Sequence, residues 1–205
     1  MNQTYNYWYF KDVVPKRYCD YIIKYALSKK EEIGLTHWDN PKVTEKIKNK
    51  EPEALQLQYK KRKSNVVWLS ESWIYNLIRK PLLAANINAG WNLKYDWIES
   101  CQFTIYRTSN YYDWHSDVRL DPKGGRNRKL SASLFLSEKE NYTGGDFEFK
   151  IQNPENGDSK ITRIDQGLSK GSLLVFPSHY YHRVTPVLTG KRYSLVMWTV
   201  GPPLT

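Results

Sequence analysis

Apolar residues in the first half of the chain recur at helical spacing in two places, within residues 15–30 and 70–88. Pro15 suits the first turn of the earlier helix. Pro81 is expected to bend or divide the later one, because proline lacks the amide hydrogen that a helix interior needs. Both segments are predicted to be helices that cover a sheet. Their apolar stripes consist of Tyr18, Ile22, Tyr25 and Ala26 in the first helix and of Trp73, Leu77 and Leu83 or Ala84 in the second.

From Tyr95 onward the pattern changes to short aromatic and β-branched segments separated by glycine, proline and asparagine, which is typical of a β-sandwich or barrel. Helices followed by a run of strands predict a mainly β fold of the α+β class, an antiparallel double-sheet jelly roll with flanking N-terminal helices. A single domain is expected over residues 1–205, with helical support in residues 1–94 and the jelly-roll core in residues 95–200. The candidate strands are residues 97–107, 129–136, 145–152, 159–164, 172–177, 182–187 and 192–200.

Basic residues outnumber acidic ones by 31 to 21, which gives a formal net charge of +10. Eight of the basic residues lie in residues 41–65 beside only three acidic ones. This balance favours anionic partners, whether nucleic acid, an acidic peptide or a carboxylate cosubstrate, and does not choose among them. The lysine-rich segment is interpreted first as a solvated surface and second as a binding patch, because runs of charge are usually solvated.

Cysteine content and hydropathy bear on the compartment. Cys19 and Cys101 are the only cysteines and lie far apart in the sequence, so neither a zinc motif nor a structural disulfide is expected. The first ten residues are aromatic and polar, and no apolar run reaches the length of a membrane span. A cytoplasmic protein without membrane association is expected, and no particular oligomeric state is predicted.

The strongest chemical signal is the segment Tyr-Tyr-Asp-Trp-His-Ser-Asp at residues 111–117. His115 and Asp117 are two residues apart, so on an extended backbone both side chains point to the same face. Two histidines and one carboxylate on one face of an iron ion leave positions open for a bidentate 2-oxo acid and for O2. The pair alone is weak evidence, because such a spacing often marks only a hydrogen bond or a solvated turn. A second histidine must come from elsewhere in the chain.

Two histidines, His179 and His182, follow the apolar strand that ends at Pro177. They are three residues apart and would face opposite sides of a continuous strand, so only one should reach a metal. His182 opens a β-branched segment that gives it a rigid position, whereas His179 falls in a predicted turn. His182 is therefore predicted to complete the metal site, and His179 to be an exposed or supporting histidine.

Arg192 comes ten residues after His182, at the start of the last apolar strand. The planar guanidinium of arginine binds a carboxylate through two parallel hydrogen bonds. An arginine in this position is usually a surface residue, but strand alternation places Arg192 on the same face as Ser194, Val196 and Trp198, which suits the lining of a pocket. Arg192 is therefore predicted to bind the far carboxylate of 2-oxoglutarate.

Several motifs in this order resemble the prolyl 4-hydroxylase branch of the 2-oxoglutarate oxygenases, including the bacterial PKHD-type hydroxylases. The resemblance covers residues 106–198, and residues 9–23 also look like the start of that family's catalytic domain, where a short strand leads into the first helix. The matching motifs are Tyr106 and Tyr112 ahead of His115 and Asp117, Leu130-Ser-Ala-Ser-Leu-Phe-Leu-Ser, Tyr142-Thr-Gly-Gly-Asp, Gly171, His182-Arg-Val-Thr-Pro-Val, Arg192 and Trp198.

The resemblance implies a double-stranded β-helix, a form of jelly roll, and oxidative decarboxylation of 2-oxoglutarate to succinate and CO2, coupled to hydroxylation of a C–H bond. The implied cofactors are Fe(II), 2-oxoglutarate and O2, with ascorbate as the expected reductant. A strand tyrosine that helps bind 2-oxoglutarate in some relatives is Phe135 here, which leaves Ser131 or Ser133 as polar substitutes. The implied roles are iron binding and catalysis for His115, Asp117 and His182, cosubstrate binding for Arg192, Tyr106 and Ser133, and a place in the substrate pocket for Tyr112, Trp198 and Arg119.

Three alternatives differ in their chemistry. A halogenase would need chloride in place of the carboxylate, yet Asp117 is present. A nucleic-acid oxygenase of the AlkB kind fits the basic charge, but those enzymes usually carry a second arginine six residues after the first, where this chain has Trp198. A metal-free jelly-roll binding module would use the same side chains only for hydrogen bonds, and it would neither take up iron nor depend on 2-oxoglutarate.

The substrate that the resemblance implies is a prolyl residue in a protein or peptide. Free amino acids and lysyl residues are alternative substrates, and nucleic acid is a less favoured partner. Specificity in such folds depends on loops over the mouth of the barrel. Residues 41–64 and 121–127 are therefore candidate lid or substrate-binding loops.

Overall fold

The computed structural model describes residues 5–36, 40–119, 124–152, 157–164 and 169–203. Residues 121–123 of the predicted loop 121–127 lie outside the described residues. The elements in chain order are β1 (Trp8–Phe10), α1 (Lys16–Leu27), β2 (Glu32–Ile33), α2 (Pro41–Lys48), α3 (Pro52–Lys61), β3 (Arg62–Lys63), β4 (Asn65–Leu69), α4 (Ser72–Asn88), β5 (Trp97–Ile98), β6 (Cys101–Tyr106), β7 (Tyr111–His115), β8 (Asn127–Phe135), the 3-10 helix η1 (Lys139–Asn141), β9 (Tyr142–Gly144), β10 (Phe147–Gln152), β11 (Ser159–Arg163), β12 (Leu173–Pro177), β13 (Tyr181–Val184), β14 (Val187–Gly190) and β15 (Arg192–Gly201).

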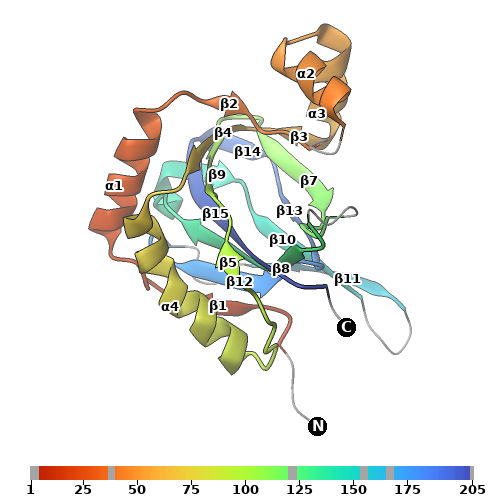
Figure 1. Ribbon diagram of the computed structural model, residues 1–205. Coiled ribbons are helices and arrows are strands. Elements are labelled where there is room, and N and C mark those ends of the chain that lie inside the picture. The colour runs from red at the N-terminus through yellow and green to blue at the C-terminus, as the bar shows by residue number, and fades with distance from the viewer. Residues whose placement is uncertain (1–4, 37–39, 120–123, 153–156, 165–168, 204–205) are drawn as a thin grey trace.

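Two sheets form the body of the protein (Figure 1). The major sheet has the strand order β1-β12-β8-β15-β6-β4-β2, with β5 paired to β15, and the minor sheet has the order β11-β10-β13-β7-β3. All strand pairs in the described part of the chain are antiparallel. Most neighbouring strands are distant in the sequence, as in a jelly roll. The predicted fold class is confirmed.

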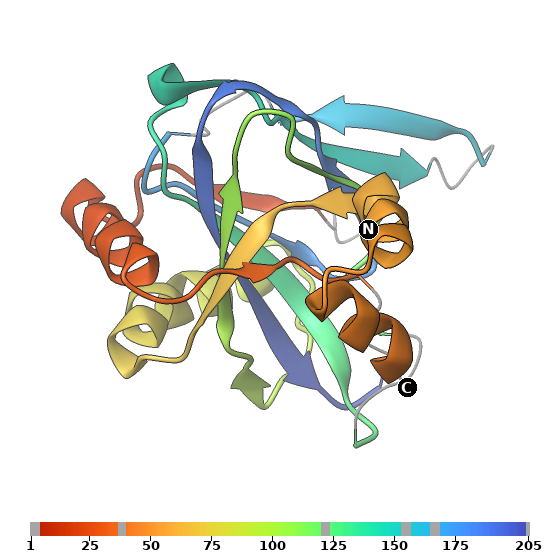
Figure 2. The same cartoon turned by 90° about the horizontal axis from the view of Figure 1, so that it is seen from above.

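Helices α1 and α4 cover the outer face of the major sheet, on the side away from α2 and α3 (Figure 2). Alternation along the strands sends Leu195 and Met197 of β15 to this face, where they join Phe103 of β6 and the buried helix residues Ile22 and Ile78 in one apolar core. The alternate residues of the same strands face the minor sheet. This inner face is where the polar side chains gather.

The two predicted helices are confirmed as α1 and α4, but Pro81 does not divide the second one. The stripe predicted for α4 is wrong: the face buried in the core carries Ile74, Ile78, Leu82 and Ala85, and Leu83 is 50% exposed. It lies inside α4, which runs unbroken from Ser72 to Asn88. Ile78 and Leu82 on either side of the proline are fully buried in the core, so tertiary packing offsets the hydrogen bond that proline cannot make. No helix among the described residues is both long and apolar enough to cross a membrane.

The first 94 residues supply strands as well as the helical support that was expected of them. Strands β1, β2 and β4 join the major sheet, and β3 joins the minor sheet. The short strand that the resemblance implies before the first helix is β1. Both β2 and β3 have only two residues, which is too short for an alternating pattern to be recognised.

The predicted strands are present with two interruptions. Residues 97–107 are divided into β5 and β6 at residues 99–100, and residues 182–187 are divided between β13 and β14. Pro186 lies at the second break, where its missing amide hydrogen cannot contribute to a ladder.

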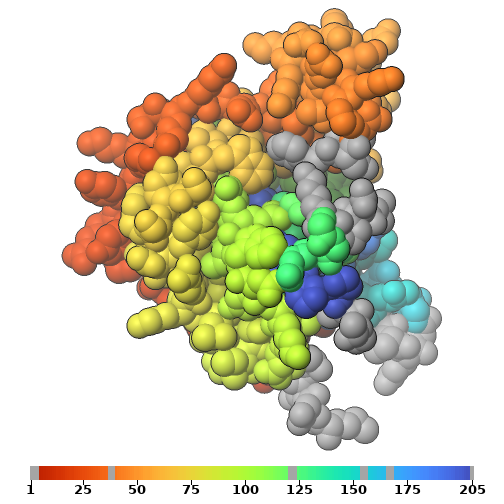
Figure 3. Space-filling model, viewed as in Figure 1, coloured from red at the N-terminus to blue at the C-terminus, as the bar shows by residue number. Residues whose placement is uncertain are grey.

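The lysine-rich segment folds into α2 and α3, which project from the body of the protein (Figure 3). Pro41 and Pro52 each stand in the first turn of a helix, and the side chain of Asn40 accepts a hydrogen bond from the amide of Val43 at 3.2 Å. Ile47 and Gln58 are buried and anchor the two helices. Neither helix is predicted from the sequence, because lysines interrupt their apolar positions.

Candidate metal centre

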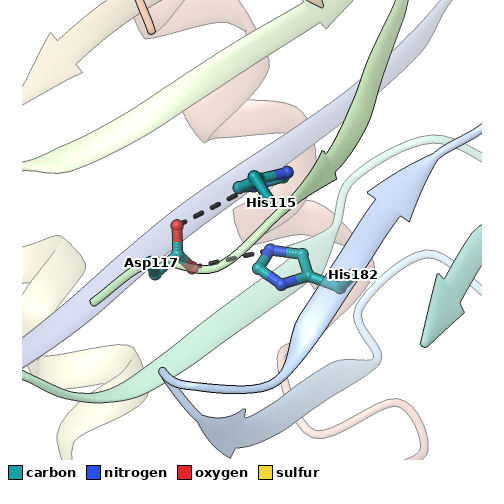
Figure 4. A group of neighbouring side chains, drawn as sticks. All are labelled: His115, Asp117 and His182. Atoms are coloured by element: carbon teal, nitrogen blue, oxygen red, sulfur yellow. Dashed lines mark ion pairs between the residues drawn. The ribbon is translucent and has the colours of Figure 1, made fainter. Parts of the chain in front are cut away.

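His115, Asp117 and His182 come together on the inner face of the minor sheet (Figure 4). His115 ends β7, and antiparallel pairing places His182 of β13 directly opposite it. Asp117 lies between the two rings, with Oδ1 at 3.8 Å from Nε2 of His115 and Oδ2 at 3.5 Å from Nε2 of His182. The three ligand atoms lie within 4.8 Å of one another, so one ion can contact all three.

Backbone carbonyls fix the orientation of both imidazoles. Nδ1 of His115 donates to the carbonyl of Asp113 at 2.8 Å, and Nδ1 of His182 donates to that of Tyr180 at 3.0 Å. A proton on Nδ1 leaves the Nε2 lone pair free, which is the tautomer that binds a metal through Nε2. His179, by contrast, lies exposed in the turn before β13, which agrees with its predicted position.

The aspartate is oriented from a different strand. Oδ2 of Asp117 accepts a hydrogen bond from the hydroxyl of Ser131 on β8 at 2.7 Å, and the amide of Asp117 donates to the carbonyl of Ser178 at 2.9 Å. Partners that hold a ligand in this way raise the affinity of a metal site. Ser131, one of the two serines predicted as polar substitutes at the cosubstrate site, thus forms a hydrogen bond to Asp117.

The protonation states of the centre suit a metal. Burial, followed by the charge of His182, lowers the pKa of His115 from 6.5 to about 3. Burial acts against ionisation of Asp117, but the two histidines and Arg128 outweigh it and lower the pKa of Asp117 to about 2. A neutral histidine and an ionised aspartate at neutral pH are the forms that ligate metals.

The metal-free protein should lose stability as the pH falls below about 6.5. The pKa of His115 is lower in the folded state, so between pH 6.5 and about 3 the unfolded chain binds a proton that the folded chain excludes. The linked stability is fully present above pH 6.5 and decreases toward pH 3. Asp117 adds a further loss between pH 3.8 and about 2. Thermal unfolding of chelator-treated protein across this range measures the effect.

His115→Asn is the matched variant for this measurement, because it keeps a polar side chain and removes the titrating ring. Its melting temperature should fall less steeply than that of the native protein over the same pH range. Equal pH dependence in the two proteins would contradict the assignment of the effect to His115.

Arg192 lies on the inner face of the major sheet, at the start of β15 and opposite Tyr106 of β6. It is only 1% exposed, its Nη1 donates to the hydroxyl of Ser194 at 3.2 Å, and its Nε and Nη2 have no acceptor among the described residues. Its Cζ lies 5.4 Å from the ring centroid of Tyr106 and 5.3 Å from that of Phe135. A buried guanidinium with free donors and no counter-charge suits an anionic ligand.

The remaining residues predicted for the site differ in what their side chains contact. Tyr112 stacks on His115 with ring centroids 3.5 Å apart, and Trp198 is buried with its Nε1 lacking an acceptor among the described residues. Ser133 is buried opposite Val196 of β15, on the inner face. The guanidinium of Arg119 forms an ion pair with Glu99.

Two arginines at the site were not predicted. The Cζ of Arg128 lies 3.7 Å from the ring centroid of Trp198, and Nη1 of Arg128 lies 3.9 Å from Oδ1 of Asp117. Arg62 of β3 is 2% exposed and lies over the ring of Tyr112, with its Cζ 4.5 Å from the centroid. Arg62 belongs to the lysine-rich run, and no pattern in that run distinguishes a buried cation from the solvated ones around it.

Comparison with known proteins agrees with this geometry. Residues 101–200 match the model of the 2OG-Fe(II) oxygenase superfamily. A PKHD-type hydroxylase from Shewanella baltica is 43% identical over 98 residues, and the PKHD-type hydroxylase YbiX from Escherichia coli is 37% identical over 99 residues. Each alignment covers 47% of this chain and 40% of the relative, so the matched stretch spans less than half the length of these relatives.

Solved structures share the fold over nearly the whole chain. A prolyl-4-hydroxylase from Pseudomonas putida aligns with a TM-score of 0.64 and 19% identity, covering 96% of this chain and 92% of that one. A prolyl hydroxylase from Trichoplax adhaerens, in complex with a peptide fragment of hypoxia inducible factor, aligns with a TM-score of 0.67 and 15% identity, covering 95% and 83%. The family's cofactors are Fe(II), 2-oxoglutarate and O2, and the described His-Asp-His set and the free donors of Arg192 fit the first two. Over residues 101–200 the chain matches the 2OG-Fe(II) oxygenase superfamily, and over nearly half of its length it is similar to the PKHD-type hydroxylases.

Proposed function

We propose that this chain is an Fe(II)- and 2-oxoglutarate-dependent hydroxylase that acts on a prolyl residue of a protein or peptide. The observation that carries the proposal is the combination, on facing sheets, of a His-Asp-His set and a buried arginine with free donors. His115, Asp117 and His182 would hold Fe(II), and Arg192 would hold the far carboxylate of 2-oxoglutarate. When bound, the iron and 2-oxoglutarate together supply oxidative decarboxylation coupled to C–H hydroxylation.

The residues of the chain prepare the site for these ligands. The carbonyls behind both histidines and the hydroxyl of Ser131 hold the three ligand side chains in position before a metal arrives. Tyr106 and Phe135 enclose Arg192 and exclude water, which strengthens its attraction for a carboxylate. Tyr106 and Ser133 are assigned to the cosubstrate, and Tyr112, Trp198 and Arg119 to the substrate pocket.

The preference for a prolyl substrate has two kinds of support. The relatives aligned in sequence are PKHD-type hydroxylases, and the structural neighbours include prolyl hydroxylases, one of them bound to a peptide. Beside β7, Tyr111 and residues in and just before α3 line a pocket on the surface. Its lining consists of Lys50, Pro52, Leu55, Gln56, Tyr59, Lys60 and Tyr111.

The test is turnover of 2-oxoglutarate to succinate with Fe(II) and ascorbate, combined with mass spectrometry of a panel of proline-containing peptides. Succinate together with a gain of one oxygen on proline is the expected result, and Asp117→Ala should give neither. Succinate without peptide oxidation would reject the prolyl substrate and direct the search to nucleic acids and small molecules. A protein that neither binds iron nor makes succinate would be a binding module.

A further inference from the structure

Arg62 is a second buried arginine beside the metal centre, and the proposed function gives it no role. Its side chain is almost fully buried, and its Nη2 has no hydrogen-bond acceptor among the described residues. A buried guanidinium without a counter-charge costs stability, which other interactions must offset. A cation held under these conditions indicates a ligand that completes it.

The surroundings of Arg62 repeat those of Arg192, the arginine on the facing sheet that is proposed to bind the carboxylate of 2-oxoglutarate. Each arginine lies two residues before a serine and donates to its hydroxyl. Nε of Arg62 donates to Oγ of Ser64 at 2.8 Å, and Nη1 of Arg192 donates to Oγ of Ser194 at 3.2 Å. In both cases the hydroxyl fixes one edge of the guanidinium and leaves other donors free.

A tyrosine ring packs against each of the two guanidinium groups. Arg62 lies opposite Tyr112 in the register of the minor sheet, as Arg192 lies opposite Tyr106 in the major sheet. Ring centroids lie 4.5 Å and 5.4 Å from the respective Cζ atoms. Aromatic walls of this kind shield a cation from water and increase its attraction for an anion.

The backbone around Arg62 is fitted closely to the side chain. A Cβ added to Gly34 would lie 2.6 Å from Nε of Arg62, so only glycine leaves room for the guanidinium. Nη1 of Arg62 donates to the carbonyl of Leu35 at 3.4 Å, and its own carbonyl accepts from Nε2 of the buried Gln58 at 3.2 Å. These contacts position the guanidinium before any ligand binds, with Nη2 as its free donor.

Tyr112 links Arg62 to the metal centre. Its ring contacts the guanidinium and also stacks on the imidazole of His115, at 3.5 Å between centroids and 9° between planes. The charge of Arg62 also extends to Tyr106: burial raises the pKa of both tyrosines, and Arg62 opposes that rise in both. Arg62 is therefore within electrostatic reach of the metal-site histidine and of the cosubstrate side of the pocket.

We propose that Arg62 binds a carboxylate of the substrate and so selects substrates with an acidic group close to the hydroxylated residue. The inference rests on the proposed function, in which the metal and Arg192 take the two carboxylates of 2-oxoglutarate and leave Arg62 for a different anion. That carboxylate comes either from an acidic side chain flanking the target residue in a peptide or from the α-carboxylate of a free amino acid.

Two pairs of probes separate these sources. Acetyl-Glu-Pro-Glu-amide is compared with acetyl-Gln-Pro-Gln-amide, and L-proline with L-prolinamide. Affinities are measured by calorimetry on protein loaded with Mn(II) and 2-oxoglutarate, so that no turnover occurs. The acid of one pair should bind roughly 10- to 100-fold more tightly than its amide, as expected for hydrogen bonds to a charged group. Preference in the first pair identifies a peptide side chain, and preference in the second identifies a free α-carboxylate.

Variants of Arg62 and its neighbours attribute the preference. Arg62→Gln should reduce the acid-to-amide affinity ratio to about one. Lys63→Gln removes the adjacent, partly exposed charge and should keep the ratio. Ser64→Ala keeps the Arg62 charge but removes the hydroxyl that orients it, so an intermediate acid-to-amide ratio is expected. Because this variant retains Arg62, such a ratio cannot be explained by a folding defect of Arg62→Gln.

Equal affinity for acids and amides in the native protein would overturn the inference, as would a ratio that Arg62→Gln leaves intact. A fall in 2-oxoglutarate affinity as large as the fall for the acidic probe would also overturn it, because Arg62 would then serve the cosubstrate. If the protein binds Mn(II) and 2-oxoglutarate but shows no preference for acids over amides, only the role of Arg62 is rejected. Protein that binds neither rejects the proposed function.

Discussion

Replacing Asp117 with alanine will lower the affinity for Fe(II) by more than about 100-fold and abolish succinate formation from 2-oxoglutarate. Residues that merely support metal ligands are worth about 10- to 100-fold in metal affinity, and a ligand should be worth more. Asp117 is also the only carboxylate in the described cluster, and it faces both histidines. Calorimetric titration with Mn(II) as a stable substitute for Fe(II), followed by the succinate assay, measures both effects.

Asp113→Ala is the matched control for this experiment. Asp113 lies on the same strand as His115, but its side chain is partly exposed and pairs with Lys61 at 3.7 Å. Only the backbone carbonyl of Asp113 contacts the centre, and the substitution preserves it. Metal affinity should therefore change little. Equal losses in the two variants, or full metal binding by Asp117→Ala, would show that His115, Asp117 and His182 are not the ligand set.

Arg192→Met will weaken 2-oxoglutarate binding by roughly 30-fold or more, because truncating one partner of a buried charge pair costs about 2–5 kcal/mol. The same substitution should not lower the melting temperature of the ligand-free protein. The native guanidinium is buried with two nitrogens that have no acceptor in the described part of the chain, and methionine removes that cost while filling much of the volume. Loss of binding with stability preserved or increased distinguishes a ligand-binding arginine from a structural one.

Lys191→Met serves as the control, since Lys191 precedes Arg192 directly and its side chain is exposed. It should leave both the affinity for 2-oxoglutarate and the melting temperature close to native values. Arg192→Met with native affinity would remove the arginine from the cosubstrate site, and a large drop in its melting temperature would indicate a structural role instead.

The elements that could be predicted from the sequence are those with long, regular patterns of apolar residues. Helices α1 and α4 each bury one apolar stripe against the major sheet, and strands such as β12 and β15 carry β-branched and aromatic residues between turn formers. Pro81 shows the limit of local rules, because the packing of Ile78 and Leu82 keeps α4 continuous across it. Packing partners that are distant in sequence are invisible to a local pattern.

The N-terminal strands and the two lysine-rich helices could not be predicted for a related reason. Strands β2 and β3 are defined by their partners β4 and β7 rather than by their own two residues. Helices α2 and α3 carry few apolar residues, so their capping signals, Asn40 before Pro41 and the proline at position 52, were the only available cues. Those cues have meaning only once a helix is already suspected.

The spacing of His115 and Asp117 correctly predicted that their side chains meet. The strand itself ends at His115, and Asp117 lies in a bend that its amide holds through a hydrogen bond to the carbonyl of Ser178. Strand alternation likewise placed Arg192 on the same face as Ser194, which the structure shows as a hydrogen bond at 3.2 Å. Arg62 escaped notice because burial of a cation depends on tertiary contacts, here those with Leu35 and Tyr112. The binding experiments described above test the proposed roles of these side chains: iron binding by His115 and Asp117, cosubstrate binding by Arg192 and substrate binding by Arg62.

The pairing of β1 with β12 has a consequence for biosynthesis. Phe10 lies opposite Leu173 in the finished sheet, and β12 in turn joins β1 to β8. A nascent chain leaving the ribosome cannot complete the major sheet until β12 and β15 have been made, and folds with such distant contacts form slowly. The position of His115 likewise depends on its pairing with His182. A translation product that stops before β13 would therefore lack His182 and also the strand that aligns His115.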